Sequence, residues 1–219
     1  MTDAGWLSGE DPRRLMSEVW RRCAREDRKL RLYAVACCRR IGHLIPDGPC
    51  KLALETSARY AEGAVTRDEL AGAAVAGWNA PRRAGGGGPD VSALAESAAL
   101  LAATPPGSEG ITHTPDAVRR LVRAAGGDVE EEARVQCALL RDVFGNLPRP
   151  VKLPRRWRTR DVTALARAIY EEGRFEEMPV LADALADAGC DNEEVLGHLR
   201  GKGPHVRGCW ALDLILGKR

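Results

Sequence analysis

The chain contains few of the residues that favour β-structure, and it has no long apolar run. Only two phenylalanines and three tyrosines occur among 219 residues, whereas alanine, leucine and arginine dominate. Because β-branched and aromatic side chains suit a pleated surface, this composition argues against a sheet. The apolar runs are alanine-rich and far shorter than the roughly 20 residues that a membrane-spanning helix needs. We therefore expect an all-α protein without a membrane span.

An excess of one charge is also absent, and the cysteines show no disulfide pattern. The 33 basic and 31 acidic side chains leave a net charge of only +2, so any surface for nucleic acid or anionic membrane must be local. The seven cysteines are an odd number without regular spacing, and residues 1–14 are polar rather than signal-like. We expect a cytoplasmic protein with reduced thiols.

The clearest helical pattern is "DRKLRLYAVACCRRIGHLI", residues 27–45. Apolar positions recur on one face at helical spacing, at Leu30, Ala34, Cys37, Cys38 and Ile41. Basic positions fall off that face, at Arg28, Lys29, Arg31, Arg39 and Arg40. The adjacent Cys37 and Cys38 are interpreted as core residues. A second signal, "TRDEL" at 66–70, predicts a helix that Thr66 caps.

Glycine and proline divide the chain into an N-terminal helical subdomain (1–80), a linker with one alanine-rich helix (81–110) and a C-terminal helical subdomain (111–219). The segment "PRRAGGGGP" at 81–89 loses too much backbone freedom on ordering to suit regular structure, so we predict a flexible tether over 81–90. Short breaks after residue 160 predict antiparallel neighbours, and the pattern indicates roughly nine helices. The expected fold is a multi-helix bundle or a set of irregular antiparallel hairpins.

A final helix is predicted over 204–216, where Pro204 lies at a helix start. Val206, Trp210 and Leu214 recur every four residues and predict a buried stripe, which Cys209, Leu212 and Leu216 widen. Asp213 is an isolated carboxylate in this apolar run, so we expect it to face solvent or to pair with Arg200 or Arg207.

Cysteine and histidine residues gather near the C-terminus, at Cys190, His198, His205 and Cys209. Zinc sites usually present ligand pairs two to four residues apart, and only the His205–Cys209 spacing could chelate. A thiol nucleophile, with Cys209 or Cys190 attacking and His205 as base, is a further alternative. We favour a structural role for this region, with neither metal nor cofactor.

One segment is rich in basic residues, "RPVKLPRRWRTR" at 149–160. Its candidates for contact with a polyanion are Arg149, Lys152, Arg155, Arg156, Trp157, Arg158 and Arg160. Arginines can neutralise phosphates while a tryptophan stacks on bases. Three prolines explain the same run as an extended, solvated connector, so nucleic acid is expected to bind weakly if at all.

Four motifs together resemble an uncharacterised, heavily duplicated bacterial family of hypothetical proteins. They are "DRKLRLYAVACCRRI", "LLRDVFGN", "PVLADALADAGC" and "GPHVRGCWALDLILGK". The resemblance covers most of the chain from Trp6 to Lys218 and implies no activity. The chain departs from that pattern at Gly42 and in the basic run "KLPRRWRTR".

These observations favour a non-enzymatic protein–protein interaction or scaffold module that uses helix faces. Two alternatives stay open: a nucleic-acid-associated protein that uses residues 149–160, and a zinc or thiol site in the C-terminal cysteine and histidine cluster.

Overall fold

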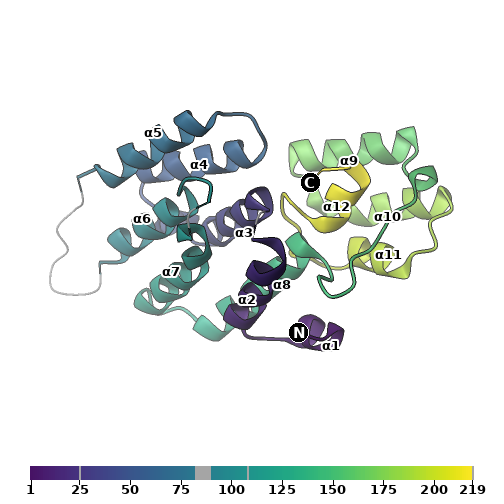
Figure 1. Ribbon diagram of the computed structural model, residues 1–219, viewed down its shortest axis with the longest axis horizontal. Helices are drawn as coiled ribbons and strands as arrows, with labels where there is room; N and C mark the ends of the chain where they lie inside the picture. The colour runs from purple at the N-terminus through teal and green to yellow at the C-terminus, as the bar shows by residue number, and fades with distance from the viewer. Residues whose placement is uncertain (25, 82–89, 108, 219) are drawn as a thin grey trace.

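The protein is all-helical, as the sequence predicts. The computed structural model describes residues 1–24, 26–81, 90–107 and 109–218, and these ranges contain twelve α-helices, three short 3-10 helices and no strand (Figure 1). Within the same ranges, no helix combines the length and the apolar character needed to cross a bilayer.

In chain order the α-helices are α1 (Asp3–Ser8), α2 (Pro12–Cys23), α3 (Asp27–Arg40), α4 (Pro49–Ala61), α5 (Arg67–Trp78), α6 (Val91–Ala102), α7 (Gly110–Ala124), α8 (Val129–Phe144), α9 (Arg160–Glu172), α10 (Met178–Asp187), α11 (Glu193–Arg200) and α12 (Trp210–Leu216). The 3-10 helices are η1 (Gly42–Leu44), η2 (Arg155–Trp157) and η3 (Phe175–Glu177).

Local capping fixes several helix starts. The predicted cap at Thr66 is confirmed: its hydroxyl accepts a hydrogen bond from the Glu69 backbone N–H at 3.2 Å, and the Glu69 carboxylate accepts one from the Thr66 N–H at 2.7 Å. At the start of α8, the Asp128 carboxylate accepts hydrogen bonds from the backbone N–H groups of Glu130 and Glu131. Such caps satisfy backbone groups that have no partner within the helix.

Helix α3 is enclosed by α4, α6, α7 and α8. Neighbouring residues on a helix point about 100° apart, so both Cys37 and Cys38 can be buried only if the helix is covered on more than one side. Both cysteines are fully buried, which confirms that they are core residues.

Arg31 of α3 was predicted to lie off the apolar face of this helix. This prediction is wrong, because the Arg31 side chain is fully buried. Its guanidinium donates hydrogen bonds to Asp27 Oδ1 at 3.0 Å, Ser57 Oγ at 3.1 Å and the Thr104 carbonyl at 3.0 Å. A buried charge is tolerated when its donors find acceptors, and here they join α3 to α4 and to the end of α6.

Two hydrophobic cores divide the protein. The first unit comprises α1–α8, and its buried apolar residues run from Trp6 to Phe144; the second unit comprises η2 to α12, with buried residues from Trp157 to Ile215. Figure 1 shows the two units side by side, with α9–α12 forming the green and yellow part. The cores therefore separate between Phe144 and Trp157 and not within 81–110 as predicted.

The alanine-rich helix α6 explains this difference. It packs against both α4 and α7, so the residues before and after 82–89 belong to the same core. Alanine-rich faces allow helices to approach closely, which composition alone does not distinguish from a helix within a linker. The predicted tether over 81–90 lies outside the described residues except at its two ends.

The predicted helix over 204–216 is wrong in its first half. Helix α12 begins at Trp210, because Gly203 and Gly208 both take positive φ angles, +85° and +92°, that interrupt a right-handed helix. The predicted buried stripe is confirmed only in part. Cys209 and Leu212 are fully buried, as is Ile215, which the pattern did not include. The other predicted members are only partly buried: Val206, Trp210, Leu214 and Leu216.

A polar network joins the two units. The Arg28 guanidinium donates to Asp213 Oδ2 at 2.7 Å, to the Tyr170 hydroxyl at 2.6 Å and to Glu62 Oε1 at 3.1 Å, and Lys218 Nζ lies 2.6 Å from Glu62 Oε2. Asp213 is therefore paired, as one of the two predicted alternatives requires. Its partner is Arg28 and neither Arg200 nor Arg207, because the tertiary structure brings Arg28, at the start of α3, within hydrogen-bond distance of Asp213.

Candidate metal centre

Four side chains with metal-binding atoms converge where the two units meet. Asp142 lies in the last turn of α8, His198 in α11, His205 in the segment 201–209 and Cys209 directly before α12. One atom from each residue, namely a carboxylate oxygen, two imidazole nitrogens and a sulfur, lies within 4.8 Å of all the others. More than fifty residues separate Asp142 from the other three, so only the tertiary structure assembles this set.

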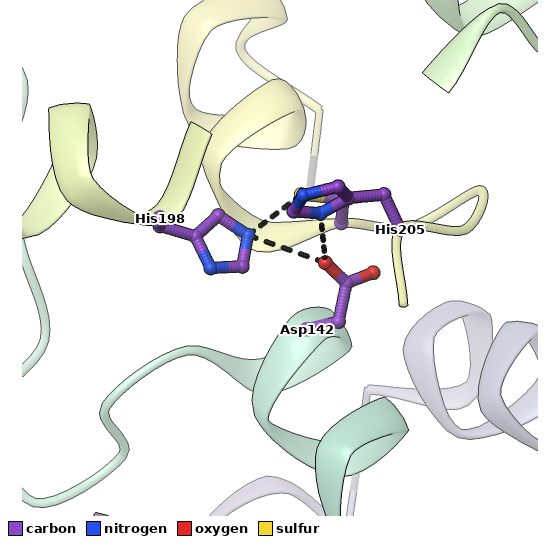
Figure 2. Close-up of side chains that lie close together, drawn as sticks. Asp142, His198 and His205 are labelled. Carbon is purple, nitrogen blue, oxygen red and sulfur yellow. Dashed lines mark hydrogen bonds and ion pairs between the residues drawn. The ribbon is translucent and has the colours of Figure 1, made fainter. Parts of the chain in front are cut away.

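The carboxylate of Asp142 lies between the two rings. His205 Nδ1 is 2.9 Å from Asp142 Oδ1, and His198 Nε2 is 3.2 Å from the same oxygen and 3.2 Å from Cys209 Sγ. Figure 2 shows the rings approaching the carboxylate from different sides, with Asp142 rising from its helix below them. The ring centroids are 5.0 Å apart in an edge-to-face arrangement. The donor atoms therefore face one another across a small space.

This cluster is shielded from solvent. Cys209 is fully buried, the Asp142 side chain is 2 % exposed, His205 is 7 % exposed and His198 is 20 % exposed. A buried carboxylate is costly unless cationic or hydrogen-bonding groups compensate it. The buried Asp142 carboxylate therefore needs compensation, either from the neighbouring imidazole and thiol groups or from a cation that all four residues bind.

The segment 201–209 is positioned by two of its glycines. The Gly203–Pro204 peptide bond is cis, and Gly203 and Gly208 adopt backbone angles that suit glycine. A Cβ atom at Gly208 would lie 2.9 Å from Leu32 Cδ1, so only glycine allows the segment to lie this close to α3. The two glycine turns bring His205 and Cys209 close to Asp142 without a helix.

The surroundings of Asp142 and His205 favour the charged forms of both side chains. Burial raises the pKa of Asp142, but hydrogen bonds with His198 and His205 outweigh it, so the net pKa is below the ordinary value. Burial lowers the pKa of His205, yet its contacts with Asp142 and the Gly201 carbonyl outweigh it and raise the net pKa. Asp142 is thus ready to act as an anionic ligand.

The Cys209 thiol has the opposite tendency. Burial, followed by the negative charge of Asp142, raises the pKa of this thiol well above its ordinary value, although the backbone N–H groups of Leu212 and Ala211 favour the thiolate. A coordinated dication reverses this balance, because it stabilises a bound thiolate directly. The N–H groups at the start of α12 already point toward the sulfur that would carry that charge.

The polar atoms of His205 and Asp142 that face away from the cluster also form hydrogen bonds. His205 Nε2 lies 3.2 Å from the Gly201 carbonyl, which can only accept, so Nε2 carries a hydrogen. Asp142 Oδ2 accepts a hydrogen bond from the Val206 backbone N–H at 3.0 Å. Ligands of protein metal sites are commonly oriented by such outer contacts.

This donor set suits zinc. Zinc takes four ligands in a tetrahedron with bonds of about 2.0–2.3 Å, which gives edges of roughly 3.3–3.8 Å. The three direct separations above, 2.9, 3.2 and 3.2 Å, are somewhat shorter than those edges, and all four ligand atoms lie within 4.8 Å of one another. Imidazole and thiolate ligands favour zinc over magnesium or calcium, which prefer oxygen.

The predicted metal candidates are partly brought together. His198, His205 and Cys209 meet, whereas Cys190 is buried in the core of the second unit and is not in the cluster. Sequence reasoning missed Asp142. The available signal was a carboxylate in the apolar run "LLRDVFGN", the feature that drew attention to Asp213.

The cluster does not have the properties of a thiol nucleophile. A reactive cysteine needs an accessible sulfur with a lowered pKa. Cys209 is inaccessible and its pKa is raised, and its nearest ring nitrogen belongs to His198 rather than to the predicted base His205.

The basic run does not form the predicted stacking surface. Trp157 is buried in the second core, at 5 % exposure, and Arg158 Nε donates to the Ile215 carbonyl at 2.6 Å. The run turns inward at η2, which hides the aromatic ring while the guanidinium of Arg156 lies over it. The remaining candidates are solvent-exposed: Arg149, Lys152, Arg155, Arg156 and Arg160.

Comparisons with protein-family models, with curated protein sequences and with solved structures find no match, so the bacterial family suggested by the four motifs stays a prediction.

Proposed function

We propose that the protein is a non-enzymatic helical interaction module that binds one Zn²⁺ ion through Asp142, His198, His205 and Cys209. The observation that carries this proposal is the convergence of one oxygen, two nitrogens and one sulfur within 4.8 Å. These atoms come from two units with separate cores, and they are held by the outer contacts of His205 and Asp142.

The ion would be structural rather than catalytic. Catalytic zinc sites keep one position open for water or substrate, whereas structural sites have four protein ligands. Four ligands are present here, and two of them, Asp142 and Cys209, are almost inaccessible. A closed site leaves the helix faces as the surfaces through which the module acts.

Metal analysis of the purified full-length chain tests the proposal. We expect one zinc ion per chain in the parent protein, and loss of that ion in His205→Ala and Cys209→Ser. Cobalt should replace zinc and give the thiolate-to-cobalt charge-transfer absorption, which Cys209→Ser abolishes.

Two matched variants serve as controls. Cys190→Ser changes a buried cysteine outside the cluster, and His113→Ala changes a histidine of α7 that is also outside it. Both should retain zinc. At a free zinc concentration 100 times the dissociation constant, binding adds about 2.7 kcal/mol of stability, so the melting temperature should rise by about 5–11 °C in the parent and both controls.

A parent protein that neither contains zinc nor gains thermal stability from it contradicts the proposal. Equal zinc content in Cys209→Ser and Cys190→Ser would exclude this ligand set.

A further inference from the structure

The four candidate ligands are divided unequally between the two units. Asp142 belongs to α8 of the first unit, whereas His198, His205 and Cys209 lie within twelve consecutive residues of the second. An ion that all four residues bind is therefore a direct link between the units. This inference rests on the proposed function.

Without such a link, the other contacts hold the two units together only weakly. Among the described residues, most buried apolar side chains fall into two separate clusters, and Leu32 of α3, which belongs to neither, lies beside Gly208 of the second unit. Val206 packs against the first core, and Trp210 lies against the backbone of Gly145. Interfaces between domains permit relative motion unless they are large and hydrophobic.

The polar network of Arg28, Glu62, Tyr170, Asp213 and Lys218 adds only modest net stability to the contact. Forming it removes the Asp213 carboxylate from water almost completely, and this desolvation offsets much of the attraction to Arg28. The network fixes the position of the second unit once that unit has docked. It does not supply a strong driving force for docking.

We propose that metal binding controls the docking of the second unit on the first. With the ion bound, Asp142 holds the 201–209 segment and α11 against α8, and the polar network closes. Without the ion, the units separate more often about the 145–156 connection.

Asp142 is the residue that distinguishes docking from metal binding. If Asp142 is replaced, three ligands remain in the second unit, and three protein ligands suffice to hold zinc in many sites. The variant Asp142→Asn should therefore bind zinc more weakly while losing the link to the first unit.

Carbodiimide cross-linking of the full-length chain tests this inference. The reagent joins an amine to a carboxylate in contact, and Lys218 Nζ and Glu62 Oε2 are 2.6 Å apart across the junction, in residues that are not metal ligands. The pair Lys51 and Asp47, also 2.6 Å apart, lies within the first unit and serves as the internal reference. Mass spectrometry measures the yield of both cross-links.

We expect chelation of zinc from the parent protein to reduce the Lys218–Glu62 yield by at least about fivefold, which corresponds to about 1 kcal/mol. The Lys51–Asp47 yield should not change. Asp142→Asn, with zinc saturating, should resemble the chelated parent. The control Asp116→Asn, which alters a carboxylate of α7 paired with Arg13, should resemble the zinc-loaded parent.

The possible failures are distinguishable. A parent that binds no zinc removes both the proposed function and this inference. A parent that binds zinc but gives the same Lys218–Glu62 yield with and without it leaves the proposed function standing and overturns the coupling. The coupling is also wrong if zinc-loaded Asp142→Asn cross-links as well as the parent.

Discussion

Replacement of Gly145 by alanine should destabilise the junction between the two units. Gly145 follows α8 with φ 64° and ψ −154°, a backbone conformation that is essentially restricted to glycine and costs other residues about 1–3 kcal/mol. Its added Cβ would also lie 3.0 Å from Trp210 Cγ and 3.1 Å from Trp210 Cδ2. Displacing a packed ring typically costs a further 1–3 kcal/mol or so. The expected loss is therefore about 2–6 kcal/mol, a large part of a stability of about 5–15 kcal/mol.

Urea unfolding followed by circular dichroism measures this loss, with zinc present at a fixed concentration. Gly173→Ala is the matched control, because Gly173 also has a positive φ, 74°, but in the ordinary left-handed region with ψ 23°. No described atom lies within 4 Å of a Cβ added there, so we expect about 1–2 kcal/mol.

A double-mutant cycle separates the two causes of the loss. In a Trp210→Ala background the steric part disappears, and Gly145→Ala should cost only the backbone strain of about 1–3 kcal/mol. Equal losses for Gly145→Ala and Gly173→Ala, or the same Gly145→Ala loss with and without Trp210, would refute the reasoning.

Three other predictions follow from buried and exposed charges. Arg31→Met should lower the free energy of unfolding by about 3 kcal/mol in the same urea assay, because it removes the donor to the buried Ser57 hydroxyl and to the Thr104 carbonyl. A surface arginine change costs about 0–1 kcal/mol. Burial raises the pKa of Glu62, but its hydrogen-bonding and cationic partners outweigh burial and lower the net pKa below the ordinary value of 4.5. The ionised Glu62 side chain therefore stabilises the folded protein above pH 4.5, and this contribution is lost as the pH falls through the pKa of the folded state. The stability difference between parent and Glu62→Gln should accordingly shrink from pH 7 to about pH 3, and a constant difference contradicts the assignment. Retention on heparin at low salt, if it occurs, should vanish when three exposed arginines are changed together to glutamate, Arg155, Arg156 and Arg160, and binding that survives the change would place the polyanion surface elsewhere.

Features that depend on short stretches of chain were predictable. The all-α class follows from composition and helical spacing, and the cap at Thr66 depends on a residue only three positions away. The energies behind these features are local, so the order of residues is enough to specify them.

Tertiary packing decided the rest. The sequence placed Arg31 and Trp157 on the surface, but both are buried, because partners distant in the chain satisfy the guanidinium and cover the ring. The boundary between the units is set by which helices pack together, and it does not coincide with the glycine-rich segment. His205 and Cys209 were predicted to meet on a helix; they meet instead through two glycine turns, and around Asp142, which no spacing rule connects to them. Periodicity describes neighbours along one helix, whereas a site between two units depends on contacts between segments that the chain brings together only when both cores have formed.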